Sequence, residues 1–337
     1  MSPIDYDQDV PKHCVRYRGW LPACKDQKER TKNRRPLKYF TLCAKQAIDV
    51  FMLEMEGILQ RDRRGCLPGV IVCEAREDEA VEIRRLVRPP VGDALIVGRL
   101  EDILTFQDTP ETLAVPPDGE VRDKQLRRLL NIKRNAQRLG ECFPFDVVNF
   151  DPYGSLVAPR LEANDLYLAF CRLFELQLAA EDFLLLLTTP VNSADAAVRA
   201  EFRERFDANV ADHESIRDAV MSRHGTTEYD RINQTERVAV EVAKSIIIPP
   251  ARANGWSHKH RGAYVYQRGG GHTMLSLVVE FHRGEDNVCE YVEDVVRIVN
   301  DMPAYYGPND AAADAEVKKH LEEVITYREQ VRAEYTS

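Results

Sequence analysis

The chain lacks the features that would place it in a membrane or in an oxidising compartment. Its 337 residues contain no apolar run of about 18 residues, so we expect no transmembrane helix. The first residues include neither a basic n-region nor an apolar h-region, so we expect no signal peptide. None of the eight cysteines forms a Cys-x-x-Cys pair, and several lie in apolar runs, where a thiol packs as a small hydrophobe. The sequence therefore predicts a reduced, cytoplasmic protein.

Signatures of metal and phosphate sites are also missing. His258 and His260 are spaced to share one side of a strand, but no second pair with zinc-finger spacing follows, so we expect no metal site. The glycines at 269–271 belong to no GxxxxGK[ST] motif, which favours a turn over a phosphate loop. Lys259 and Arg261 then predict an exposed basic loop beside that turn.

Acidic residues exceed basic ones by 55 to 46, which gives a net charge of −9. This balance excludes a uniformly basic nucleic-acid coat, but basic residues concentrate at 25–38 and 122–138. Such segments can form one phosphate-facing surface on an acidic protein. The alternative is that they are solvated helix faces and a loose arm. The residues expected to contact nucleic acid are Lys32, Arg34, Arg35, Lys38, Arg127, Arg128, Lys259 and Arg261.

Short apolar strands alternate with helices along the chain. Strands are predicted at Leu37–Cys43, Val70–Glu74, Asp93–Gly98, Phe145–Asp151 and Asp182–Thr188, with a hairpin formed by Ala263–Gln267 and Thr273–His282. Because strands that alternate with helices form parallel β-α-β units, we expect an α/β fold. It is a Rossmann-like, mostly parallel sheet with a C-terminal antiparallel β-hairpin and added helices.

The same pattern divides the chain into three parts. Residues 1–36 are polar and contain Pro11, Pro22 and Pro36, so we expect a basic N-terminal extension that is irregular, with a short helix as the alternative. A sheet domain follows at 37–283. Within that domain we expect a helical insertion at about residues 193–246. Residues 284–337 are expected to form a C-terminal helical segment.

The stretch from Phe145 to Ser155, which reads FDVVNFDPYGS, is the most informative of the chain. A buried strand runs directly into an Asp-Pro-Tyr-Gly turn, and open α/β sheets bind ligands at the carboxyl ends of their strands. The carboxylate of Asp151 and the carbonyl of Pro152 can accept the hydrogens of an exocyclic amine, while the ring of Tyr153 stacks on it. We therefore expect a catalytic motif at Asp151, Pro152, Tyr153 and Gly154; the alternative is a turn that only closes the strand.

The order of these elements resembles the class I S-adenosylmethionine-dependent methyltransferase fold, over roughly residues 37–283. The turn at Asp151 is similar to the Asp-Pro-Phe-Gly motif of tRNA guanine N2-dimethyltransferases and of the three-Cys-motif partner family. The resemblance implies that S-adenosylmethionine is the cofactor. Its ribose would be held by Glu74, and its adenine edge would be read near Glu101 and Asp102. The alternative is that Glu74 only precedes a helix and that Glu101 and Asp102 are helix N-terminal acids, positions where an acid is favoured anyway.

The resemblance further implies that the turn after the first strand, residues Leu42, Cys43, Ala44, Lys45 and Gln46, holds the tail of the cofactor. In the family this turn contains glycines, because the cofactor approaches the backbone closely. Here no glycine occurs between Trp20 and Glu56. Either Lys45 meets the cofactor carboxylate directly, or the pocket is closed.

Two functions of different classes follow. The first is an S-adenosylmethionine-dependent N-methyltransferase that acts on a base amine of RNA or DNA, with the target base flipped out of its stack. The second is a catalytically inactive methyltransferase-fold subunit that binds a protein partner in a bacterial defence or nucleic-acid processing complex.

Overall fold

The computed structural model describes residues 9–31, 35–43, 46–87, 95–107, 120–152, 154–156, 164–191, 196–232, 234–268, 272–283, 291–301 and 314–336. Of the residues expected to form a site, Lys32, Arg34, Ala44, Lys45 and Tyr153 lie outside these ranges.

Strands are separated by helices along the described chain as far as β5, and further helices follow before the last two strands. The strands are β1 (Tyr39–Thr41), β2 (Val70–Glu74), β3 (Leu95–Val97), β4 (Val147–Phe150), β5 (Asp182–Pro190), β6 (Trp256–Arg268) and β7 (His272–Arg283). The helices up to β5 are α1 (Val10–Val15), η2 (Arg16–Trp20), α2 (Leu21–Arg30), α3 (Ile48–Met55), α4 (Glu77–Val87), α5 (Leu100–Leu104), α6 (Glu120–Cys142), α7 (Asp165–Leu176) and η4 (Gln177–Ala179). Those after β5 are α8 (Ala196–Asp212), α9 (Glu214–His224), η5 (Tyr229–Arg231), α10 (Gln234–Glu241), η6 (Val242–Ile247), α11 (Ile248–Ala253), α12 (Tyr291–Asp301) and α14 (Ala315–Thr336).

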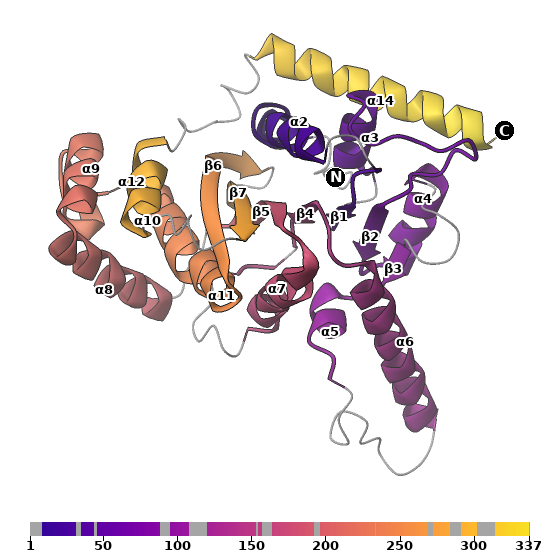
Figure 1. Cartoon of the computed structure of the whole chain (residues 1–337), viewed down its shortest axis with the longest axis horizontal. Coiled ribbons are helices and arrows are strands. Elements are labelled where there is room, and N and C mark those ends of the chain that lie inside the picture. The colour runs from indigo at the N-terminus through magenta and orange to yellow at the C-terminus, as the bar shows by residue number, and fades with distance from the viewer. Residues whose placement is uncertain are drawn as a thin grey trace.

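The strands form one sheet in the order β3-β2-β1-β4-β5-β7-β6 (Figure 1). Strands β1 to β5 pair in parallel, whereas β7 pairs antiparallel with both β5 and β6. The expected α/β fold with a mostly parallel sheet is confirmed, and the last two strands pair as predicted. Because β2 and β3 lie on one side of β1 and β4 and β5 on the other, the winding direction reverses between β1 and β4.

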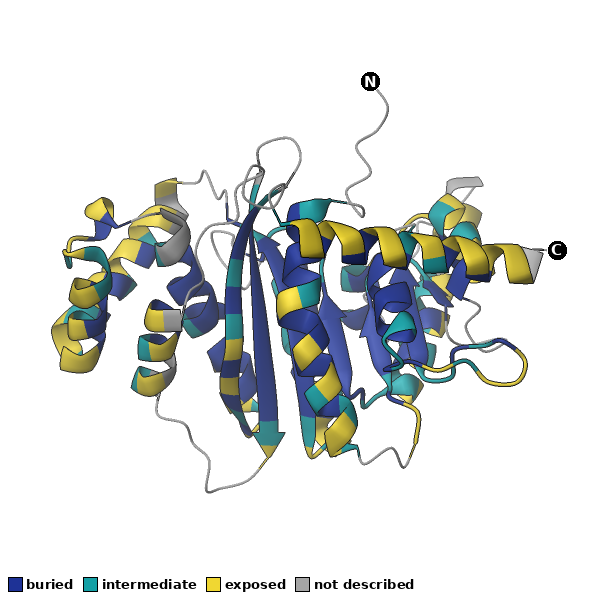
Figure 2. Cartoon of the chain, turned by 90° about the horizontal axis from the view of Figure 1, so that it is seen from above, coloured by how far each residue is buried: buried dark blue, intermediate teal, exposed yellow. Residues whose placement is uncertain are grey.

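Both faces of the sheet are covered, which explains why its strands are apolar throughout. Successive side chains of a strand point to opposite faces. Phe40 joins a core with residues of α5 and α7, and its neighbour Tyr39 joins a second core with residues of α3 and α4. Figure 2 shows the strands as the most deeply buried part of the molecule. None of the described helices is long and apolar enough to cross a bilayer.

The expectation of an irregular N-terminal extension was wrong for residues 9–31. They form α1, η2 and α2, and Cys14 and Trp20 are buried. The indole of Trp20 donates a hydrogen bond to Ser276 Oγ of β7 over 3.1 Å. Pro11 is the second residue of α1, where a missing N–H removes no helical hydrogen bond. Pro22 lies inside a helical run that continues from η2 into α2, and the hydroxyl of Tyr264 donates to the carbonyl of Arg18, four residues before it. These helices therefore belong to the sheet domain.

The expected exposed basic loop was also wrong, because Lys259 and Arg261 lie within β6. Lys259 is exposed. The residues on either side of it, His258 and His260, are buried on the opposite side of the strand. Helices α8, α9 and α10 and most of η6 lie in the expected helical insertion, α11 follows it, and α12 and α14 lie in the C-terminal segment. Helix α14 returns across the sheet domain and packs on α1, α3 and α4 (Figure 1).

Candidate functional site

The crevice outside the carboxyl ends of β1 and β4 is the place where a sheet of this winding binds ligands. Asp151 and the buried Pro152 follow β4 directly, and Leu42 and Cys43 follow β1. The amide of Leu42 donates to the carbonyl of Asn149, so the two strand ends stay side by side at this point. The structure thus brings the expected catalytic acid and the residues after the first strand together, and we call the region at these two strand ends the crevice.

Asp151 is already paired within the chain. Its Oδ2 lies 2.6 Å from Nζ of Lys12 in α1, and the two side chains are only 13% and 8% exposed. A charge buried to this extent is stable only when it is paired. The carboxylate that we expected to accept hydrogens from a target amine therefore holds an ammonium group of its own chain.

Helix α14 holds α1 in this position. Nε2 of His13 lies 2.9 Å from Nδ1 of His320, and the hydroxyl of Tyr17 donates to Glu316 Oε1 over 2.9 Å. Arg18 forms an ion pair with Asp314 just before α14. Burial, followed by the nearby Arg16 and His320, lowers the pKa of His13 to about 2, so this imidazole is neutral near pH 7. We call α1 and α14 together the terminal clasp.

The far end of the terminal clasp reaches the turn after β1. Arg328 of α14 is buried and donates a hydrogen bond to Oε1 of Gln46. The next residue, Ala47, is buried with φ 49°, a left-handed conformation in which glycine is favoured. The chain therefore adopts a glycine-type backbone here without a glycine, and the β-carbon of Ala47 fills the space that a glycine would leave.

A buried polar cluster that sequence reasoning missed lies beneath the crevice. Asp49 Oδ2 accepts hydrogen bonds from Tyr39 Oη, Thr41 Oγ1 and Asn149 Nδ2 over 2.6, 2.8 and 3.0 Å. All four side chains are buried, and burial followed by the charge of Asp49 raises the pKa of Tyr39. The cluster fixes the start of α3 on β1 and β4. Its only signal in the sequence was an acid in the first turn of an otherwise apolar helix.

Each of the three acids expected to hold a cofactor already has a hydrogen-bond or ion-pair partner in the chain. Glu74 ends β2 but is 3% exposed, and its Oε1 accepts from the amide of Arg76 over 2.8 Å. Burial raises the pKa of this carboxyl. Glu101 forms an ion pair with Arg99, and Asp102 with Arg128 of α6.

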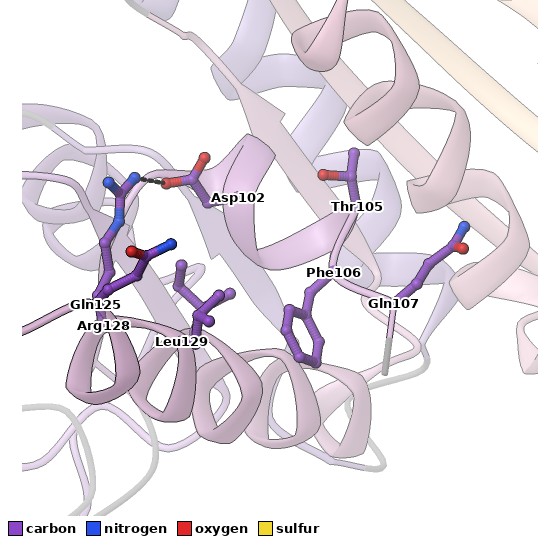
Figure 3. Close-up of a pocket in the computed structure, with 8 residues that line it drawn as sticks. Asp102, Thr105, Phe106, Gln107, Gln125, Arg128 and Leu129 are labelled. Atoms are coloured by element: carbon purple, nitrogen blue, oxygen red, sulfur yellow. Dashed lines mark hydrogen bonds and ion pairs between the residues drawn. The ribbon is translucent and has the colours of Figure 1, made fainter. Parts of the chain in front are cut away.

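Asp102 lines a groove of about 430 Å³ between α5 and α6 (Figure 3). The side chains around it include Thr105, Phe106, Gln107, Gln125, Arg128 and Leu129. The groove lies on the outer side of α5 and is separate from the crevice at Asp151.

The residues expected to contact nucleic acid do not form one surface. Arg35 makes two hydrogen bonds to Asp146, and Nζ of Lys38 donates to the carbonyl of Cys142, both before β4. Arg127 and Arg128 lie about 20 Å from Cys142 along α6 at 1.5 Å per residue. Arg261 pairs with Asp26 and Glu280 at the β6 edge. Among the described residues, therefore, these cations lie on three separate parts of the molecule.

The described residues of the crevice do not fit S-adenosylmethionine in this conformation. Glu74 has little exposed surface with which to reach a ribose, and Gln46 is bonded to Arg328. Ala47 is fully buried in the core beneath this turn, so its backbone is not open to a cofactor tail. The carboxylate of Asp151 is paired with the ammonium group of Lys12 and is therefore not available to a ligand.

A double-mutant cycle tests the ion pair that closes the crevice. Lys12→Met leaves a buried carboxylate unpaired, so we expect it to lower the free energy of unfolding by about 3 kcal/mol. Asp151→Asn removes the other charge, and the double variant should recover part of the loss. Urea denaturation of the four proteins measures the coupling, for which we expect at least about 1 kcal/mol. Effects that add to within about 0.5 kcal/mol would show that the two side chains do not interact.

The terminal clasp should weaken in mild acid. In the unfolded chain a histidine gains a proton near pH 6.5, whereas the folded-state pKa of His13 is about 2. The stability that this difference contributes is complete above pH 6.5 and is lost as the pH falls below it. Between pH 7 and 5.5 the free energy of unfolding of the wild type should fall by about 1 kcal/mol more than that of His13→Asn. Equal losses in the two proteins would show that His13 is not buried as a neutral group.

Comparison with known proteins adds one similarity. Residues 98–246, less than half of the chain, match the model of a family described as PP_RS20740-like. No curated protein and no solved structure matches the chain. The matched segment begins at the end of β3 and includes α6, Asp151, β5 and α8 to α10.

Proposed function

We propose that the chain is a methyltransferase-fold subunit that binds a protein partner and has no S-adenosylmethionine site of its own. The sheet supports the fold assignment, since five parallel strands followed by an antiparallel C-terminal hairpin agree with the arrangement expected from the resemblance to class I methyltransferases. The observation that carries the proposal is the buried contact between Lys12 and Asp151. An ammonium group of the chain takes the position in which the fold would hold a substrate amine.

The two ends of the chain support this proposal together. α1 covers the end of β4 through Lys12, and α14 covers the end of β1 through Arg328. α1 and α14 are also joined to each other through His13 and His320. A ligand could enter the crevice only if several buried polar contacts were broken at once, each of which costs free energy when a partner is left unsatisfied.

A second candidate is the N-methyltransferase acting on a base amine of RNA or DNA. It is favoured by the position of Asp151 and Pro152 at the end of β4 and of Glu74 at the end of β2. In that case the terminal clasp would be a gate that opens before substrate and cofactor bind. The carboxylate of Asp151 and the carbonyl of Pro152 would then accept the hydrogens of the amine.

Calorimetric titration with S-adenosylmethionine separates the two functions. The wild type and an Arg328→Met variant, which lacks the hydrogen bond to Gln46, are titrated to millimolar ligand. We expect no binding to either protein. Binding to the wild type would contradict the proposal outright. Binding to Arg328→Met alone, lost again when Glu74→Ala is added, would instead support a gated enzyme.

A further inference from the structure

Helix α6 carries a surface that the rest of the described chain leaves uncovered. Its C-terminal half is attached to the sheet domain through the buried Asn135 and Leu139, and Nδ2 of Asn135 donates to the carbonyl of Val97 over 2.8 Å. In its N-terminal half, residues 123–128 are all exposed. Figure 1 shows this half directed away from the sheet. The helix therefore projects as an arm.

One side of this arm combines apolar and basic side chains. Leu126 and Leu130 are 37% and 55% exposed and are one turn apart. Arg127 and Arg134 lie together on one side of the leucines, and at 100° per residue the four positions fall within about 100° of the helix circumference. We call these four residues the outer face of α6. It points away from the groove at Arg128, which lies on the α5 side.

The basic groups of the arm are not neutralised by the body. Arg128 pairs with Asp102 on the α5 side, but no acidic side chain of the described residues pairs with Lys124, Arg127 or Arg134. A helical segment without tertiary packing is marginally stable. An anionic partner on this face would pair with the guanidinium groups of Arg127 and Arg134 and supply the missing packing.

We propose that the outer face of α6 binds an acidic amphipathic helix of a partner protein. The two leucines would pack against the apolar stripe of that helix, and Arg127 and Arg134 would pair with carboxylates beside the stripe. A nucleic acid fits less well, because phosphate contacts leave the leucines exposed and the outer face has no aromatic ring on which a base could stack. This inference rests on the proposed function and names the surface through which the subunit would bind its partner.

The test uses a fluorescent 20-residue helical peptide that has leucines at i, i+3, i+4 and i+7, flanked by glutamates. Fluorescence anisotropy measures the binding of this peptide to the full-length protein. A scrambled peptide of the same composition and a 20-base-pair DNA duplex serve as competing probes. We expect the patterned peptide to bind at least tenfold more tightly than the scrambled one. Leu126→Ser/Leu130→Ser and Arg127→Glu/Arg134→Glu should each weaken binding at least tenfold. Leu178→Ser, which changes an exposed leucine of η4, is the matched control and should leave binding unchanged.

Three results would overturn the inference. They are equal binding of the two peptides, no effect of the leucine changes, or tighter binding of the duplex that only the arginine changes reduce. The last result would identify α6 as a nucleic-acid contact instead. Binding at α6 and binding of S-adenosylmethionine in the crevice are measured separately. A protein that binds the patterned peptide and also the cofactor would refute the proposed function and leave the outer face of α6 intact.

Discussion

The buried ion pair between Lys12 and Asp151 is the contact on which the rest of the site depends. Two charges removed from water are stable only while they remain together, so α1 must stay docked on the end of β4. Docking of α1 buries His13, whose neutral ring then meets His320 and brings α14 across the sheet domain. α14 in turn places Arg328 on the turn after β1. One pair at the centre of the crevice thus couples both ends of the chain to the two central strands.

Much of the sheet could be predicted from sequence, because the positions of the strands and their parallel pairing follow from local patterns. Apolar runs that end at Glu74 and Asp151, each followed by a helix or a turn, are sufficient to indicate parallel strands with acids at their carboxyl ends. The antiparallel pairing of β6 and β7 was likewise readable from two apolar runs around a glycine turn. Prolines gave the wrong answer at the N-terminus, since Pro11 stands in the first turn of α1 and the helical run continues through Pro22.

The closed state of the crevice could not be predicted, because it depends on contacts between distant residues. Lys12 lies in a polar segment, where a lysine is ordinarily exposed, and its partner is 139 positions away in the chain. Gln46 and Arg328 are separated by 282 positions. The missing glycines after β1 indicated that something was unusual there. Only the structure shows that Ala47 adopts the left-handed backbone itself and that α14 covers the turn beside it.

Chemical labelling of lysines tests the central claim, that α1 buries Lys12 against Asp151, most directly. The native protein is treated with a limiting amount of an amine-reactive reagent, and the modification of each lysine is followed over time by mass spectrometry. Lys12 is 7% exposed, whereas Lys124 and Lys259 are exposed and serve as internal references. The account predicts that Lys12 reacts at least tenfold more slowly than both references in the native protein and as fast as they do in urea. Equal rates in the native protein would contradict it.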